Sequence, residues 1–260
     1  MTIEKGVMIE HRAVIRLVRN TNFVNFDREH RLLQLAPISF DASIFEIWGA
    51  LLNGASLAIM PVGVPSLAAI VETVRLHEVT TAFFTPALFN MLVDTSIDRL
   101  GSLKQIVVGG DVVSPGHFLR AIDHLPKCAF INGYGPTEST VFAVCYLASR
   151  ESAMCERIPL GFPIANTRAF ILDGNLDPVP VGATGELYLG GDGLARGYLN
   201  CPELTSEKFI AVPGSGERLY RTGDLARFRG DGAIEFLGRI DAQLKISGYR
   251  VEPGEIVFAL

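Results

Sequence analysis

Hydrophobic positions in the first half of the chain recur with two periods, one typical of strands and one typical of helices. Short apolar runs rich in β-branched and aromatic residues predict buried strands. These runs span residues 31–36, 57–60, 79–84, 103–108 and 129–132. Helices are predicted between them, after Ser43, after Ser66, from residue 87 and from Ser114–Pro115. This alternation predicts an α/β fold with a largely parallel sheet and helices on both faces.

Residues suited to ligand binding follow several of these predicted strands. In a parallel sheet of this kind, ligands bind beyond the carboxyl ends of the strands. The residues at those ends are polar, aromatic or glycine, namely Phe40 and Asp41, Phe83 and Phe84, Gly109 to Asp111, and residues 132–138. Because the carboxyl ends of parallel strands meet at one edge, these segments predict a single site.

The pattern changes near Ile158, where short alternating runs replace helical periodicity. Runs at 168–172, 185–189 and 233–237 are separated by Asp-Gly or Gly-Gly turns. They predict an antiparallel, barrel-like β-subdomain at 158–238, after an α/β subdomain at 1–157. Residues 239–260 are expected to form a hinge and the start of a truncated C-terminal subdomain. Both ends of the chain stop in mid-pattern, which predicts a piece of a longer protein.

Composition narrows the classes of function. The 260-residue chain is 48% hydrophobic, with a net charge of −5 and a pI near 5.6. This balance argues against a nucleic-acid or anionic-membrane surface, which needs clustered Lys and Arg. The cysteines form no CxxC pair, so free thiols are expected rather than a zinc site or a disulfide. With no secretory leader and no apolar run near the ~20 residues of a membrane span, a cytoplasmic protein is expected.

The segment NGYGPTE at 132–138 carries the clearest chemistry. Its glycines and Pro136 predict a tight loop directly after a buried strand. The loop ends in Thr137, whose hydroxyl can bond a phosphate oxygen, and Glu138, whose carboxylate can hold Mg²⁺ against that phosphate. The segment therefore predicts nucleotide chemistry.

Three other charged residues are open to two interpretations each. Asp224, in a predicted loop at 220–225, can accept both hydroxyls of a ribose or can cap a turn. Asp41 lies among apolar residues, where its burial is costly unless it meets a cation, or it caps a helix in competition with Ser43. Arg239 is either a surface charge or a ribose or phosphate contact.

Taken together, these segments resemble the adenylate-forming superfamily, and most closely the amino-acid adenylation domains of nonribosomal peptide synthetases. The resemblance covers essentially the whole chain and implies the core of the adenylate-forming enzyme fold. The motifs that carry it, in order, are KGVMIEH (5–11), FDAS (40–43), NGYGPTE (132–138), GEL through ARGYL (185–199), YRTGDL (220–225) and GRIDAQLKISGYR (238–250).

The resemblance implies a nucleotide site for ATP or AMP with Mg²⁺. Thr137 would contact the AMP phosphate, and Glu138 would hold the metal. The other residues assigned to the nucleotide are Gly110, Asn132, Tyr134, Gly135, Asp224 and Arg239. Tyr134 would pack near the adenine, while Asp224 would bind the ribose hydroxyls with help from Arg239.

The resemblance also implies an amino-acid site, in which Asp41 pairs with the α-ammonium group. A desolvated carboxylate discriminates amino acids from fatty acids, which lack that cation. The side-chain pocket would consist of Ala42, Phe45, Phe83, Val107, Gly109, Gly133, Val141 and Phe142. No member is charged or polar, the phenyl rings narrow the pocket, and the two glycines leave room. We therefore expect a medium aliphatic substrate, valine first, with isoleucine or leucine next.

The implied reaction joins the amino acid to ATP and then loads the acyl group onto the phosphopantetheine thiol of a peptidyl carrier protein, in nonribosomal peptide biosynthesis. Implied partners are that carrier protein, neighbouring synthetase domains and a small MbtH-like activator protein. Asp241 would be the hinge of the C-terminal subdomain.

The chain departs from the family where the phosphate loop should precede Lys5 and where a lysine-bearing C-terminal subdomain should follow. We therefore expect little adenylation activity from the fragment itself. Two alternatives stay open, an acyl-CoA ligase of the same superfamily and a nucleotide-binding fragment without catalysis.

Overall fold

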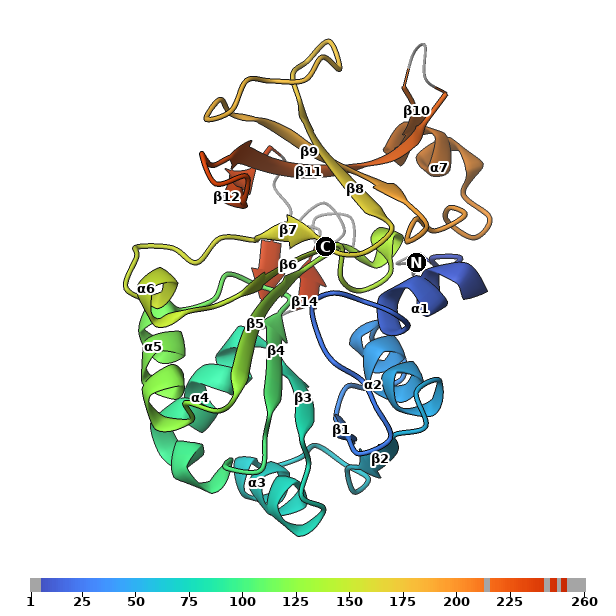
Figure 1. The fold of residues 1–260 in the computed structure, drawn as a ribbon. Helices are drawn as coiled ribbons and strands as arrows, with labels where there is room; N and C mark the ends of the chain where they lie inside the picture. Colours follow the sequence, from blue (N-terminus) through green and yellow to red (C-terminus); the bar gives the residue numbers. More distant parts are fainter. Residues whose placement is uncertain (1–5, 213–215, 241–243, 247–248, 252–260) are drawn as a thin grey trace, which may run out of the picture.

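The larger part of the chain is built on one seven-stranded sheet (Figure 1). A computed structural model describes residues 6–212, 216–240, 244–246 and 249–251. The strands of the sheet are β1 (Arg31–Gln34), β2 (Ser56–Ile59), β3 (Thr81–Phe84), β4 (Gln105–Gly109), β5 (Ala129–Tyr134), β6 (Val144–Leu147) and β7 (Phe162–Pro163). Their order is β2-β1-β3-β4-β5-β6-β7. The pairs from β2 to β5 are parallel and the last two are antiparallel, which confirms the predicted sheet.

Helices cover both faces of this sheet (Figure 1). They are α1 (His11–Val18), α2 (Ala42–Leu51), α3 (Leu67–Leu76), α4 (Pro86–Ser96), α5 (Pro115–His124) and α6 (Arg150–Ala153), with 3₁₀ turns η1 (Ile97–Arg99) and η2 (Thr137–Ser139). Alternate strand residues serve opposite faces, as the period of a strand requires. Phe83 and Val107 pack in the core beside α1 and α2, whereas Phe84 and Val108 pack in the core beside α3, α4 and α5.

A second, antiparallel sheet follows in the chain. It contains β8 (Thr167–Leu172), β9 (Gly185–Gly191), β10 (Phe209–Ala211), β11 (Arg218–Phe228) and β12 (Ile234–Arg239). The order is β10-β11-β9-β8, and β12 also pairs with β11. A separate hairpin joins β13 (Leu244–Ile246) to β14 (Tyr249–Val251). The antiparallel architecture predicted for the second half is confirmed, while the subdomain limits at 157 and 238 stay predictions because β7 belongs to the first sheet.

Two segments predicted as loops belong to strands. Residues 132–134 continue β5, because this strand is paired with β4 on one side and with β6 on the other. Residues 220–225 lie inside β11. There the pairing with β9 shifts between Arg221 and Leu225, and Gly223 adopts a φ of 75°. The glycines of both segments were interpreted as turn residues. In β5, Gly133 instead allows close pairing with both neighbouring strands, and in β11 Gly223 lies at a local irregularity.

The predicted helix starts are confirmed in part. The Ser66 hydroxyl accepts a hydrogen bond from the backbone N–H of Ala69 at 3.2 Å, so this residue caps α3. The prediction that Ser43 caps a helix was wrong, because α2 begins at Ala42 and Asp41 occupies the N-cap position without a side-chain capping bond. The Ser43 hydroxyl instead lies 3.4 Å from the carbonyl oxygen of Ile38, to which it donates.

The periodicity predicted no helix after about residue 158, and this prediction was wrong. Helix α7 (Pro202–Lys208) lies within the β-rich part and begins with proline at its first turn. None of its residues is buried, so it shows no apolar stripe by which the sequence could reveal it.

The described cysteines are free thiols, as expected. Cys145 is buried, and burial raises the pKa of its thiol above the ordinary range. Cys128 is only half-buried, and burial raises its pKa to about 12. Both thiols therefore stay protonated and unreactive near neutral pH.

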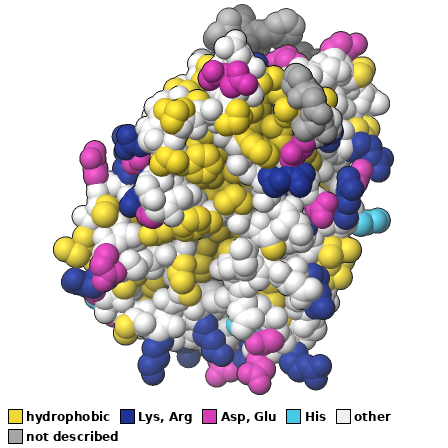
Figure 2. All heavy atoms as spheres, turned by 45° about the horizontal axis from the view of Figure 1, so that its top comes forward, with side chains coloured by type: hydrophobic (Ala, Val, Ile, Leu, Met, Phe, Trp, Pro, Cys, Tyr) yellow, Lys and Arg dark blue, Asp and Glu magenta, His cyan; other side chains and the backbone are white. Residues whose placement is uncertain are grey.

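The surface is not uniformly polar. On the face in Figure 2, hydrophobic side chains gather in a central band, whereas most Lys, Arg, Asp and Glu side chains lie toward its margins.

In the part of the chain that the structure describes, no helix has both the length and the apolar character of a membrane span.

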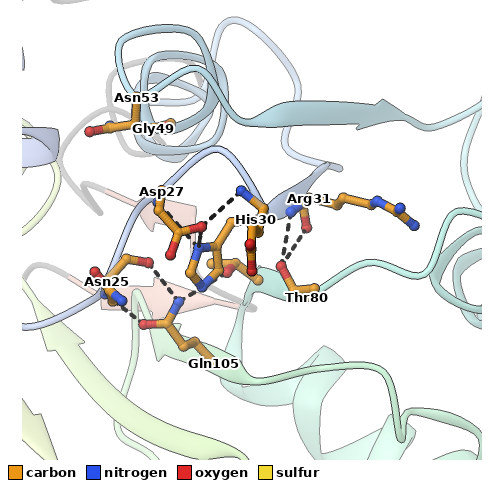
Figure 3. A network of polar contacts seen from close by, with 10 residues as sticks. Asn25, Asp27, His30, Arg31, Gly49, Asn53, Thr80 and Gln105 are labelled. Atoms are coloured by element: carbon orange, nitrogen blue, oxygen red, sulfur yellow. Dashed lines mark hydrogen bonds and ion pairs between the residues drawn. The ribbon is translucent and has the colours of Figure 1, made fainter.

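A polar network closes the amino-terminal end of the first sheet (Figure 3). The buried Gln105 amide donates to the carbonyl oxygen of Asn25 at 2.8 Å and accepts from its backbone N–H at 2.6 Å. The Thr80 hydroxyl oxygen accepts from the backbone N–H of Arg31 at 2.9 Å. These bonds satisfy main-chain groups of Asn25, which precedes β1, and of Arg31, which begins it, so the polar groups there serve the fold.

Candidate functional site

Two adjoining cavities lie where the carboxyl ends of the first sheet face the second sheet. The first, of about 100 Å³, is lined by Phe40, Asp41, Ala42, Phe83, Gly110, Gly133, Tyr134, Gly135, Pro136, Thr137, Val141, Phe142, Tyr220, Thr222, Asp224 and Arg239. The second, of about 560 Å³, adds the start of α5, residues 156–158 and β12. Both cavities share Gly110, Gly133, Tyr134, Gly135, Asp224 and Arg239. Segments from all the predicted strand ends therefore reach one region, although Phe84 turns away into the core.

Asp41 and Thr137 meet across the first cavity. Asp41 stands at the start of α2, and Thr137 begins the turn η2 after β5. The Thr137 hydroxyl donates to Asp41 Oδ2 at 2.5 Å. The residue assigned to the substrate ammonium and the residue assigned to the phosphate thus lie within one hydrogen bond of each other.

An ion pair between the buried Asp224 and the partly buried Arg239 lies in the wall that the two cavities share. Asp224 of β11 and Arg239 of β12 are directly paired in register, and Arg239 Nη1 lies 2.5 Å from Asp224 Oδ1. The Tyr134 hydroxyl donates to the other carboxylate oxygen of Asp224. Burial raises the pKa of Tyr134 well above its ordinary value, and the negative charge of Asp224 raises it further, so the hydroxyl remains a donor. Asp224 lies inside a strand and does not cap a turn.

Glu138 does not line either cavity. Its side chain is buried, and Oε1 accepts from the Tyr198 hydroxyl at 2.5 Å. Burial and the neighbouring Glu138 charge raise the pKa of Tyr198. In this arrangement the carboxylate is not presented to a metal ion in the first cavity. Among the described residues, no three His, Cys, Asp or Glu side chains group as metal ligands.

Aromatic rings form the apolar wall of the first cavity. The Phe142 ring centroid lies 5.8 Å from that of Phe83 and 5.4 Å from that of Phe45. A Cβ atom added at Gly133 would lie 2.8 Å from the Phe142 ring, and one at Gly109 would lie 2.2 Å from the carbonyl oxygen of Gly133. At Gly109 a carbonyl group of β5 occupies the space that was expected to be open, whereas Gly133 lines both cavities beside the Phe142 ring, and its role in leaving room for substrate stays a prediction.

Several predicted residues lie behind the cavity walls. Phe45, Val107 and Gly109 line neither cavity, and Phe45 and Val107 are part of the core beside α1 and α2. Asn132 lines only the second cavity, and its amide donates to the carbonyl oxygen of Pro159 at 2.8 Å. Asp241 lies outside the described residues. The roles assigned to these residues stay predictions.

Four residues that line the first cavity carried no assigned role in the predicted site. They are Phe40, Pro136, Tyr220 and Thr222. Thr222 is two residues before Asp224, and its hydroxyl accepts from the Asp224 backbone N–H at 3.0 Å while donating to Leu187 O at 2.6 Å. Each of the four lies within one of the family motifs, and this position in the sequence could have indicated that they belong to the site.

Comparison with known proteins places this geometry in context. The family described as AMP-binding enzyme matches residues 4–199. Tyrocidine synthase 3 of Brevibacillus parabrevis is 51% identical over 254 residues, which cover 97% of this chain and 4% of that protein. Gramicidin S synthase 2 of Aneurinibacillus migulanus is 47% identical over 259 residues, which cover 97% of this chain and 6% of that protein.

Two solved structures are also similar. Holo-PA1221, described as an NRPS protein containing adenylation and PCP domains bound to a vinylsulfonamide inhibitor, has a TM-score of 0.93 at 36% identity and covers 97% of this chain and 44% of its own. The Klebsiella oxytoca NpsA N-terminal subdomain in complex with 3-hydroxybenzoyl-AMSN has a TM-score of 0.84 at 36% identity, over 90% of this chain and 60% of its own. The chain thus spans a small part of each curated relative and about half of each solved chain.

Proposed function

Since the chain belongs to the AMP-binding enzyme family and is similar over nearly its whole length to segments of nonribosomal peptide synthetases, we propose that it is the part of an adenylation domain that binds an amino acid and ATP. In the proposed reaction, a carboxylate oxygen of the amino acid attacks the α-phosphorus of ATP. The bond from that phosphorus to the bridging oxygen breaks, and pyrophosphate leaves. The aminoacyl adenylate then passes its acyl group to a carrier-protein phosphopantetheine thiol and releases AMP.

The contact between the two cavities supports this proposal most directly. Asp41 and Thr137 line the first cavity, and the wall that it shares with the second cavity carries Asp224 and Arg239. An ammonium group at Asp41 and a ribose at Asp224 would lie on either side of Thr137. The substrate carboxylate and the α-phosphate would then meet beside the Thr137 hydroxyl. Positioning of this kind supplies a large part of the rate of a two-substrate reaction.

Asp41 also favours an amino acid over a fatty acid as the substrate, which argues against the alternative of an acyl-CoA ligase. The carboxylate is half-buried between Phe40 and the start of α2. A partly desolvated carboxylate favours a ligand that brings a cation and disfavours one that leaves the charge without compensation.

For the substrate side chain we propose a medium aliphatic group, with valine first. The side chains of the pocket that line the first cavity are Ala42, Phe83, Val141 and Phe142, all apolar. The Phe142 ring over Gly133 narrows this part of the cavity and favours a short branched side chain over a long one. Isoleucine or leucine is next, since one methylene changes binding by only about 1–3 kcal/mol.

The proposed nucleotide contacts follow the same wall. The Asp224 carboxylate, held by Arg239, would accept the ribose hydroxyls, and Tyr134 would pack near the adenine. Mg²⁺ remains an expected cofactor by family resemblance, and its ligation by Glu138 stays a prediction.

Proposed partners are a peptidyl carrier protein, neighbouring synthetase domains and an MbtH-like activator. The similar protein PA1221 is described as containing a PCP domain together with its adenylation domain. The hydrophobic band in Figure 2 also supports contact with further protein, because contiguous exposed apolar surface is typical of interaction sites.

ATP–pyrophosphate exchange on the full-length protein tests the proposal. Exchange driven by valine, and more weakly by isoleucine or leucine, is the expected result. Exchange driven only by a fatty acid would support an acyl-CoA ligase instead. Binding of AMP without exchange for any of the twenty amino acids would contradict catalysis.

A further inference from the structure

A buried arginine outside the predicted site holds one of its walls. Arg16 lies on α1, and only 3% of its surface is exposed. Its Nη1 donates to the carbonyl oxygen of Phe142 at 2.7 Å and to the Thr167 hydroxyl at 3.1 Å. Its Nη2 donates to the carbonyl oxygens of Ser139 at 2.6 Å and Thr140 at 3.3 Å. Within the described part of the chain these partners are all neutral oxygens, and none is a carboxylate.

The carbonyl groups that Arg16 holds belong to a strained turn at residues 139–142. Thr140 and Val141 both adopt a left-handed backbone, with φ angles of 55° and 65°. β-Branched residues rarely adopt this conformation, so surrounding contacts must maintain it. The turn follows Thr137 and Glu138 directly, and Val141 lines the first cavity. The shape of the cavity therefore depends on the contacts that keep this turn in place.

Gly193 makes room for the guanidinium group. A Cβ atom at this position would lie 2.1 Å from Arg16 Nη2 and 2.5 Å from Cζ. The same glycine accepts a hydrogen bond from the Thr140 hydroxyl through its carbonyl oxygen at 2.8 Å. The glycine thus contacts both the arginine and the turn, which explains its place in the segment between β9 and the ARGYL motif.

We propose that Arg16, seated against Gly193, is a positioning residue that fixes the turn at 139–142 and thereby determines which side chains the first cavity accepts. Burial lowers the pKa of Arg16 to about 10, so the group is charged at neutral pH. A charged donor bonds carbonyl oxygens more strongly than a neutral one. The role in selectivity rests on the proposed function, whereas the role in fixing the turn does not.

The variants Arg16→Met, Arg16→Lys and Gly193→Ala test the proposal in the full-length protein. Met keeps the length and removes every donor, Lys keeps the charge but not the forked geometry, and the Ala methyl group displaces the guanidinium. The matched controls are Arg12→Met, an exposed arginine on the same helix, and Gly101→Ala, where an added Cβ meets nothing within 4 Å.

Amide hydrogen exchange of residues 138–144 gives a readout that needs no activity. Exchange in this segment is expected to become about tenfold faster or more in Arg16→Met and Gly193→Ala, less so in Arg16→Lys, and to stay unchanged in both controls. Unchanged exchange in Gly193→Ala and Arg16→Lys would overturn the proposal, even if Arg16→Met fails to fold.

The second readout is the ratio of kcat/KM for valine to that for phenylalanine in pyrophosphate exchange. A displaced turn should reduce this ratio by about tenfold or more, because small misplacements alter reactive geometry unequally for different substrates. A residue that matters only for stability would lower both rates by one factor and leave the ratio intact, and that result would overturn the role in selectivity. A wild-type protein without amino-acid-dependent exchange would refute the proposed function, while hydrogen exchange would still decide the role of Arg16.

Discussion

Replacement of Glu46 by glutamine should remove most of the decrease in stability between pH 5 and pH 8. Glu46 lies on α2 with 1% of its surface exposed. Its Oε2 accepts hydrogen bonds from the backbone N–H groups of Leu35 and Ala36, both at 3.1 Å. These bonds hold the end of β1, from which the chain continues to Asp41. Burial raises the pKa of Glu46 from its ordinary 4.5 to about 8, and the two backbone bonds offset only part of that increase.

The pKa values set the direction and the size of the effect. The folded chain binds the proton of Glu46 more tightly than the unfolded chain, so this stabilisation is complete below pH 4.5 and is lost as the pH rises through 8. At about 1.4 kcal/mol per pH unit, the whole interval corresponds to about 5 kcal/mol, of which about 3 kcal/mol falls between pH 5 and pH 8. A glutamine does not titrate, and its carbonyl oxygen can accept from the same backbone groups.

Urea denaturation of wild type and Glu46→Gln at pH 5, 6, 7 and 8 measures this effect. The free energy of unfolding of the wild type relative to the variant should fall by about 3 kcal/mol across the series. The control is Glu203→Gln, an exposed residue of α7, which should follow the wild type throughout. Parallel curves for wild type and Glu46→Gln would refute the reasoning, since they would mean that Glu46 has a similar pKa in the folded and unfolded chains.

Two further predictions concern the walls of the site. Tyr134→Phe removes the donor to Asp224 and should raise the KM for ATP about tenfold in pyrophosphate exchange, as expected for one bond to a charged group; an unchanged KM would contradict the role of this pair. Gly109→Ala places a methyl group 2.2 Å from a carbonyl oxygen of β5, so the central strands must separate and the chain should lose about 2 kcal/mol or more. Thermal unfolding measures that loss, Gly101→Ala serves as the control, and equal melting temperatures would contradict the packing described.

The sequence predicted the first sheet well because its signals are local. The inner parallel strands β3 and β4 are short apolar runs buried on both faces, and the capping residue Ser66 and the first-turn Pro115 mark two helix starts. Helix α1 was not predicted although its residues follow an amphipathic pattern, and no local pattern reports that the charged Arg16 is buried as well. Residues 220–225 of β11 were predicted as a loop because glycine is typical of turns. Gly223 instead lies at an irregularity within a long strand.

Only the parts of the site that lie in motifs or at strand ends could be predicted from the sequence. Asp41, Thr137, Asp224 and Arg239, which family resemblance assigned to the site, line the adjoining cavities. The position of the Phe142 ring over Gly133 depends on contacts between strands, which no local pattern reports. Glu46 is the only charged residue of the mostly apolar helix α2, which is a weak indication in the sequence that its carboxyl group is buried.

Calorimetric binding of two non-hydrolysable adenylate analogues tests the central claim most directly. One is the sulfamoyl analogue of valyl adenylate, and the other is its desamino counterpart, which lacks only the ammonium group. The full-length wild type should bind the amine-bearing analogue about ten- to a hundredfold more tightly, while Asp41→Asn should bind the two about equally. Asp98→Asn, at an exposed position, should retain the wild-type preference. Equal affinity of the wild type for both analogues, or no binding of either, would contradict a shared site in which Asp41 recognises the amino acid beside the nucleotide.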